Sequence, residues 1–218
     1  MKILLLGATG GLGKEILLYA IKNKININCL VRDPKKINNQ SPYIKVFKGD
    51  ATSYKDLIYA LEDSSIVIST LNVCRRNIIP WSKITNSKTT ISDFTNNILK
   101  ISKEKQINRF ISISAWGANE TKKDIPFWFK YLIKFSNLKY PYKDHEKHEE
   151  IIKNSNLNWT ILRPVAFINT KKLMKIKESY KNHPKPSLII NRKSLAYFII
   201  NIINDENYYK LMPVVSKD

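Results

Sequence analysis

The sequence predicts an α/β fold in which helices cover both faces of a doubly wound parallel sheet. Three observations predict it. The chain opens with an apolar run that stops at a glycine cluster, and strand-like apolar runs then alternate with segments of helical periodicity. The length of 218 residues suits one well-buried domain and leaves no room for a large second one. No internal repeat, low-complexity block or linker interrupts the chain, so residues 1–218 are expected to form a single compact domain.

The first strand is predicted over Met1–Leu6, and a glycine-rich stretch, GATGGLG, follows it directly. A helical pattern begins at Lys14, so the glycines stand between a strand and a helix, as a dinucleotide-binding fingerprint requires. In such a turn Gly7 permits a tight bend, Gly10 lets the backbone approach a pyrophosphate, and Gly13 lets the helix pack closely on the strand. The first N–H groups of the helix then face the phosphates. An ordinary glycine turn is the alternative, but the whole pattern favours a Rossmann-type nucleotide site.

The other elements follow in order. Strands are expected over residues 25–31, 43–47, 65–71, 109–115 and 158–164, with shorter apolar segments at 188–190 and 211–215. Helices are expected over residues 54–62, 91–104, 144–154 and 194–203, with Ser53 and Ser194 opening the first and last of these. Residues 121–140 are rich in aromatic side chains, which suit a lid over a flat substrate as well as packing in the core or in a dimer.

Composition narrows the class of protein. The net charge of +19 invites a nucleic-acid interpretation, but the lysines are spread along the chain, so nucleic acid is not an expected partner. Whether or not the protein binds nucleic acid, its positive charge favours anionic ligands. Cys29 and Cys74 form neither a CxxC pair nor a disulfide framework. No apolar stretch is long enough to span a membrane and no signal peptide is recognised, so we expect a cytoplasmic protein without a membrane partner.

Four segments in order carry a resemblance to a known family. They are the glycine turn from Gly7, Val31-Arg32-Asp33, Gly49-Asp50, and Trp159-Thr-Ile-Leu-Arg-Pro164. Together they resemble the atypical short-chain dehydrogenase/reductases of the NmrA-like, NAD(P)H-binding type, and within it the flavin reductase (biliverdin reductase B) group. The resemblance covers nearly the whole chain, and it is specific for fold and cofactor but weak for substrate. It implies that NADP(H) is held by these residues: Gly7, Thr9, Gly10, Gly11, Leu12, Gly13, Arg32, Lys36, Asp50, Ala51, Ser69, Thr70, Leu71, Pro164 and Val165.

The end of the second strand indicates which dinucleotide is preferred. An acidic residue there accepts hydrogen bonds from a ribose 2′-hydroxyl, whereas an arginine suits a 2′-phosphate. Arg32 stands at that point, and Lys36 is near enough in sequence to add charge. Asp33 could be the acidic residue displaced by one position, but Pro34 follows it, which favours the start of a turn. We therefore predict NADP(H) over NAD(H).

The catalytic pattern of carbonyl-reducing relatives is missing. Those enzymes carry Tyr-x-x-x-Lys, and no tyrosine of this chain has a lysine four residues later. Counting back from Arg163-Pro164, the resemblance places Pro141 and His145 at those two positions. Direct hydride transfer to a flavin, quinone or tetrapyrrole-like acceptor needs no such pair, because the proton can come from water. The resemblance also places Ser114 beside the nicotinamide, although a serine that merely ends a strand and caps a turn fits the sequence equally.

His145 is the second catalytic candidate. His145, His148 and Glu149 can share one helical face, but their order differs from the HExxH zinc motif, so no metal is expected. A solvated first helical turn is the favoured interpretation, and a proton donor in the pocket is the alternative. The leading functional hypothesis is an NADPH-dependent reductase of a conjugated acceptor, and the second is a non-catalytic NADP(H)-binding redox sensor. Whether the protein is a monomer or a homodimer stays open.

Overall fold

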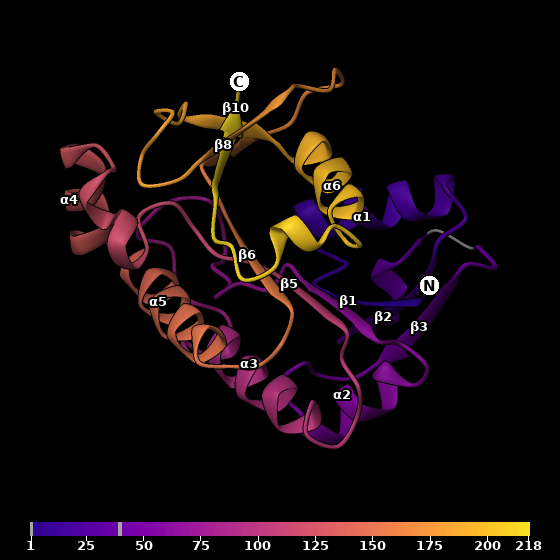
Figure 1. Ribbon diagram of the computed structural model, residues 1–218. Helices are drawn as coiled ribbons and strands as arrows, with labels where there is room; N and C mark the ends of the chain where they lie inside the picture. Colours follow the sequence, from indigo (N-terminus) through magenta and orange to yellow (C-terminus); the bar gives the residue numbers. More distant parts are fainter. Residues whose placement is uncertain (1, 39–40) are drawn as a thin grey trace.

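The computed structural model describes residues 2–38 and 41–218, and its central sheet is built outward from β1 (Lys2–Leu6). Met1, the first residue of the expected opening strand, lies outside the described residues. The side chains of β1 are buried from Ile3 onward because helices cover the sheet on both faces. The eight strands run in the order β3-β2-β1-β4-β5-β6-β10-β8 (Figure 1). The bounds of the others are β2 Asn26–Val31, β3 Ile44–Lys48, β4 Ile66–Ser69, β5 Arg109–Ile113, β6 Trp159–Pro164, β8 Ile176–Ser179 and β10 Val214–Lys217.

The order 3-2-1-4-5-6 of the first six strands, all parallel, is that of a Rossmann-type sheet, so the predicted fold class is confirmed. The far edge differs from the expectation of a purely parallel sheet. β10 joins β6 in parallel, and β8 then pairs with β10 in the antiparallel sense. β7 (Ala166–Ile168) and β9 (Ile189–Asn191) form a separate two-stranded sheet. Strands of three or four residues are too short for their pairing to be predicted from periodicity.

Helices pack on both faces of the sheet (Figure 1). On one face α1 (Gly11–Lys22) contacts α6 (Arg192–Asn201), and apolar residues of both helices belong to one core cluster. On the other face α3 contacts both α2 and α5, and these three helices share the second cluster. Their bounds are α2 Tyr54–Leu61, α3 Thr90–Ile101 and α5 Lys139–Lys153. Among residues 2–38 and 41–218, no helix combines the length and apolar character needed to cross a bilayer.

Two helix starts differ from the predictions. α5 begins at Lys139, five residues before the expected start, and Pro141 fits its first turn because no helical hydrogen bond is required of its nitrogen. Ser194 was expected to open the last helix, and this is wrong. Asn191 caps α6 by accepting a hydrogen bond from the Lys193 N–H, and Ser194 lies inside the helix. Ser53 does cap α2, as predicted. The aromatic stretch forms a helix of its own, α4 (Phe127–Phe135).

A long-range cap ties α5 to α3. The Asp144 carboxylate accepts hydrogen bonds from the N–H groups of Ile91 and Ser92, at 2.7 and 3.1 Å. These N–H groups belong to the first turn of α3, whose own N-cap residue makes no side-chain bond to them. A carboxylate is favourable at a helix N-terminus. This contact fixes the part of α5 that borders the candidate site.

Candidate nucleotide-binding site

The glycine turn after β1 is as tight as the sequence predicts. Gly7 has a φ of +84°, and the Gly10 N–H donates to the Gly7 carbonyl over 2.9 Å. A Cβ added at Gly7 would lie 2.5 Å from Thr70 Oγ1, and one added at Gly13 would collide with the Gly7 carbonyl. Thr70 donates from its hydroxyl to the Leu6 carbonyl at 3.1 Å, which holds the loop after β4 against the turn. α1 therefore starts beside the ends of β1 and β4, and no side chain of the N-cap residue Gly10 occupies its first N–H groups.

A cavity of about 760 Å³ lies at the carboxyl ends of the parallel strands, where such sheets bind their ligands. Among the residues predicted to hold the cofactor, three do not line this cavity. Gly13 packs against the glycine turn, Lys36 is exposed, and Ser69 is buried in β4. The others line it: Gly7, Thr9, Gly10, Gly11, Leu12, Arg32, Asp50, Ala51, Thr70, Leu71, Pro164 and Val165.

Arg32 and Asp50 lie at one end of the cavity. The Asp50 carboxylate accepts hydrogen bonds from the N–H and hydroxyl of Thr52, at 2.8 and 2.7 Å. Partial burial opposes ionisation of Asp50, but these bonds and the charge of Arg32 lower its pKa overall. Asp33 accepts a hydrogen bond from the Lys35 N–H at 3.1 Å and opens a short 3-10 helix. Asp33 thus starts a turn, as predicted, and it does not line the cavity.

Arg192 lies over the glycine turn, and the sequence reasoning missed it. A Cβ added at Gly11 would meet Arg192 Nε at 2.8 Å. The guanidinium also stacks 4.8 Å from the centre of the Phe167 ring and donates to Asn169 Oδ1 at 2.8 Å. Burial lowers the pKa of Arg192, and Glu15 opposes that shift in part. A cation beside a helix N-terminus is unfavourable unless an anion lies between them. No sequence pattern links Arg192 to a turn some 180 residues earlier in the chain.

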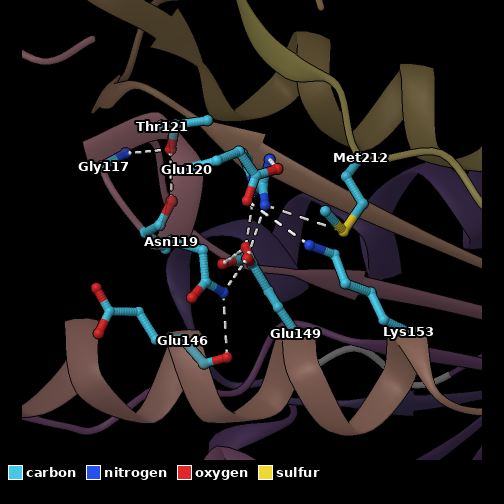
Figure 2. A network of polar contacts seen from close by, with 11 residues as sticks. Gly117, Asn119, Glu120, Thr121, Glu146, Glu149, Lys153 and Met212 are labelled. Atoms are coloured by element: carbon cyan, nitrogen blue, oxygen red, sulfur yellow. Dashed lines mark hydrogen bonds and ion pairs between the residues drawn. The ribbon is translucent and has the colours of Figure 1, made fainter. Parts of the chain in front are cut away.

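Ser114 also lines the cavity, and its hydroxyl is bonded to a buried ionic network around Glu149, part of which Figure 2 shows. The Ser114 hydroxyl donates to Glu149 Oε1 at 2.6 Å. Arg163 donates to both oxygens of the same carboxylate, from Nε at 2.8 Å and from Nη2 at 2.7 Å. Asn119 Nδ2 adds a bond to Oε2 at 2.7 Å. The proton of Ser114 is therefore engaged, and its remaining lone pairs are available to a donor in the cavity, which Ser114 lines.

The network continues outward through Glu120. Arg163 Nη1 donates to Glu120 Oε1 at 2.7 Å, and Lys153 lies 3.6 Å from the other oxygen of Glu120. Burial opposes the charge of Arg163, but its bonds to the two carboxylates raise its pKa overall. Figure 2 shows Glu149 and Lys153 extending from α5 toward the segment that carries Asn119 and Glu120. A fully paired guanidinium of this kind fixes the surrounding side chains in one arrangement.

His145 is not in a solvated first helical turn, so that interpretation is wrong. It lies mid-helix in α5 with only 3% of its surface exposed, and it lines the cavity. Burial lowers its pKa to about 4, although Glu149 opposes the shift, and its Nδ1 has no hydrogen-bond partner. The earlier start of α5, which buries one face of the helix against α3 and the sheet, explains the difference. His145 is thus a neutral ring at pH 7.

His148 faces away from the cavity. Its ring nitrogens bond the hydroxyls of Thr95 and Ser112, at 2.7 and 2.8 Å, and burial holds its pKa well below the usual range. Among the described residues, no group of three histidine, cysteine or acidic side chains is arranged to hold a metal ion.

Several aromatic side chains line another part of the cavity wall. Tyr142 donates from its hydroxyl to the Trp116 carbonyl at 3.1 Å, and burial raises the pKa of this phenol. Pro141, which by resemblance replaces the catalytic tyrosine, lies on the same wall. Arg75 adds a positive charge close to Tyr142. The remaining aromatic residues of the wall are Trp116, Trp128, Phe129 and Phe167.

The sheet order and the glycine turn at the strand ends define a Rossmann-type nucleotide-binding protein. A family model described as NAD(P)H-binding matches residues 7–206, and the chain belongs to that family. This agrees with the family suggested by the sequence. Comparison with curated protein sequences finds no significant match.

Solved structures of three proteins show how general the fold is. ChuY, described as an anaerobilin reductase from Escherichia coli O157:H7, is 16% identical with a TM-score of 0.80, over 100% of this chain and 97% of its own. An oxidoreductase, ylbE, from Lactococcus lactis is 17% identical with a TM-score of 0.79, over 100% and 91%. A short-chain dehydrogenase/reductase from Veillonella parvula, solved with NADP, is 18% identical with a TM-score of 0.77, over 99% and 94%. At these identities the likeness shows the fold.

Proposed function

We propose that the protein is an NADPH-dependent oxidoreductase that reduces a flat, conjugated acceptor. One observation carries the proposal: a single cavity joins the glycine turn and Arg32 to Ser114 and an aromatic wall. The first part suits a dinucleotide and the second suits a flat ring system. The structure of a related fold with NADP and the reductase description of ChuY support the same class of reaction.

The residues that line the cavity fit the phosphate groups of a dinucleotide. The first N–H groups of α1 and the guanidinium of Arg192 approach one another across Gly11, and a diphosphate between them removes their repulsion. Arg32 has no ion-pair partner among the described residues, and it stands where a 2′-phosphate is read. We assign Arg32 to the 2′-phosphate and Arg192 to the diphosphate, which predicts NADP(H) over NAD(H).

Ser114 is proposed to orient the nicotinamide. Its proton is engaged by Glu149, so its oxygen can accept a hydrogen bond from the carboxamide N–H₂ and hold the ring in one orientation. NADPH supplies a hydride to the acceptor. The accompanying proton comes from water, because the neutral ring of His145 and the bonded phenol of Tyr142 are weak acids. His145 then borders the acceptor as a neutral wall residue.

The test is NADPH oxidation, followed by absorbance, with FMN, a set of quinones and biliverdin as acceptors. Saturable turnover with any of them establishes the reductase and its acceptor class. Tight NADPH binding without turnover supports the second candidate, a redox sensor that binds NADP(H). Pro141 and His145, in place of a tyrosine and a lysine, are the observation that favours this second candidate.

A further inference from the structure

Large apolar side chains are exposed on α4 and on the neighbouring loop of residues 78–81. The exposed fraction is 92% for Ile78 and 75% for Phe127. Single exposed apolar residues are common, but a continuous group of them marks an interaction surface. We name this group the docking face: Ile78, Ile79, Trp81, Phe127, Trp128, Tyr131 and Phe135.

Direct contacts join the loop to the helix. The Trp81 indole N–H donates to the Phe135 carbonyl at 3.0 Å, and Asn137 Nδ2 donates to the Trp81 carbonyl at 2.8 Å. The rings of Tyr131 and Phe135 stack with centres 6.0 Å apart. Figure 1 shows α4 at the outer margin of the molecule, beyond the end of α5. The loop and the exposed face of α4 therefore lie together at the outer margin of the protein.

The charges around the docking face are almost all positive. Between residues 75 and 83 the charged side chains are Arg75, Arg76 and Lys83. Between residues 122 and 135 there are four lysines and a single acid, Asp124. Lys134 Nζ lies 5.3 Å from the centre of the Phe135 ring. Aromatic rings with flanking lysines suit the interface of an anionic bilayer, where the rings enter the headgroup layer and the cations pair with lipid phosphates.

We propose that the docking face binds the surface of an anionic lipid bilayer. A second copy of this chain is the competing occupant, but two copies would bring these cations face to face with almost no acidic partners. The sequence-based expectation of no membrane partner rests on the lack of a spanning segment, and surface binding needs none. Trp128 belongs to both the docking face and the cavity wall, so the bound bilayer lies beside the cavity.

The experiment is co-sedimentation of the full chain with vesicles. Phosphatidylcholine alone is compared with phosphatidylcholine containing phosphatidylglycerol, each at low and high salt. We expect binding to the mixed vesicles that weakens with salt, and little binding to phosphatidylcholine. The double variant F127S/Y131S should bind the mixed vesicles at least about tenfold more weakly than the parent, because two rings leave the headgroup layer. Tyr59→Ser, which removes a 71% exposed ring from α2, is the matched control and should bind like the parent.

A charge variant tests the contribution of the lysines that flank the docking face. K123E/K134E should lose binding to the mixed vesicles, whereas Lys55→Glu on α2 should change it little. Circular dichroism checks that each variant is folded. The proposal is overturned by lack of binding to the mixed vesicles, by equal losses for face and control variants, or by a dimer that the F127S/Y131S change converts to monomer. None of these measurements requires NADPH turnover, so they stand apart from the proposed reductase activity.

Discussion

Ser114 and Glu149 are joined by a hydrogen bond of 2.6 Å, donated by the serine hydroxyl to a carboxylate that Arg163 holds with two further bonds. This pairing links the end of β5 to the middle of α5 and to β6. It makes Ser114 a hydrogen-bond acceptor toward the cavity, and it makes the orientation of that hydroxyl depend on a buried ion pair.

Changing Glu149→Gln should lower the free energy of unfolding by about 3–5 kcal/mol, because the buried Arg163 loses its buried ionic partner and keeps only the half-exposed carboxylate of Glu120. Urea unfolding followed by circular dichroism measures the loss. Glu146→Gln on the same helix is the control, since Glu146 pairs with Lys122 at the surface over 3.5 Å and should cost less than about 1 kcal/mol. Similar losses for both variants would show that the network does not support the fold.

Ser114→Ala should reduce the turnover number about threefold to tenfold while the affinity for NADPH changes little. The reason is that one neutral hydrogen bond to the carboxamide, of about 0.5–1.5 kcal/mol, no longer orients the ring. Steady-state kinetics and a binding titration measure the two effects. Ser112→Ala, in β5 two residues before Ser114 but bonded to His148, serves as the control. Unchanged turnover in the Ser114 variant would return this residue to a purely structural role.

Arg32→Glu should weaken NADPH binding by about 1.5–3 kcal/mol and leave NADH binding nearly unchanged, because only NADPH carries the 2′-phosphate. Fluorescence titration with both dinucleotides measures the difference. Lys36→Glu is the control, and its effect should be much smaller since Lys36 does not line the cavity. Equal weakening of both dinucleotides by the Arg32 change would mean that Arg32 does not contact the 2′-phosphate.

Arg192→Gln should weaken NADPH and NADH by the same amount, about 1.5–3 kcal/mol, because the diphosphate is common to both. The same titration distinguishes this pattern from that of Arg32. Arg76→Gln, an exposed arginine outside the cavity, is the matched control. Tighter binding after removal of the Arg192 charge would contradict its assignment to the diphosphate.

The stability of the protein should fall as the pH drops from about 6.5 toward 4. In the folded state burial lowers the pKa of His145 to about 4, whereas the unfolded chain has the ordinary value near 6.5, so unfolding takes up protons in this range. The stability is fully present above about pH 6.5. His145→Gln should make the slope of the unfolding free energy shallower, by up to about 1.4 kcal/mol per pH unit.

The exposed His183→Gln is the control for the pH experiment and should leave the slope as it is in the parent. Urea unfolding at a series of pH values measures all three proteins. A slope that His145→Gln leaves unaltered would mean that folding does not lower the pKa of His145.

Local patterns explain what could be predicted. The strand before Gly7 and the helix after Gly13 are adjacent in the chain, so the turn between them, its tight bend and its place at the strand ends follow from neighbouring residues. Arg32 and Asp50 end consecutive strands of a parallel sheet, and their place at one edge follows from the topology. The predicted starts of α5 and α6 were less accurate than the rest. Pro141 is compatible with the first turn of a helix, and Asn191 rather than Ser194 caps α6.

The sequence by itself determined the α/β class, the glycine turn and the family. The class and the turn rest on periodicity and on neighbouring residues, and the family rests on four short segments in a fixed order. Only the tertiary structure decided that Arg192 lies on Gly11, that Ser114 donates to Glu149, and that His145 is buried and neutral. The two contacts join residues 181 and 35 positions apart, and the burial of His145 depends on which face of α5 packs inward. Packing of helices on the sheet sets them, and no local pattern encodes that packing.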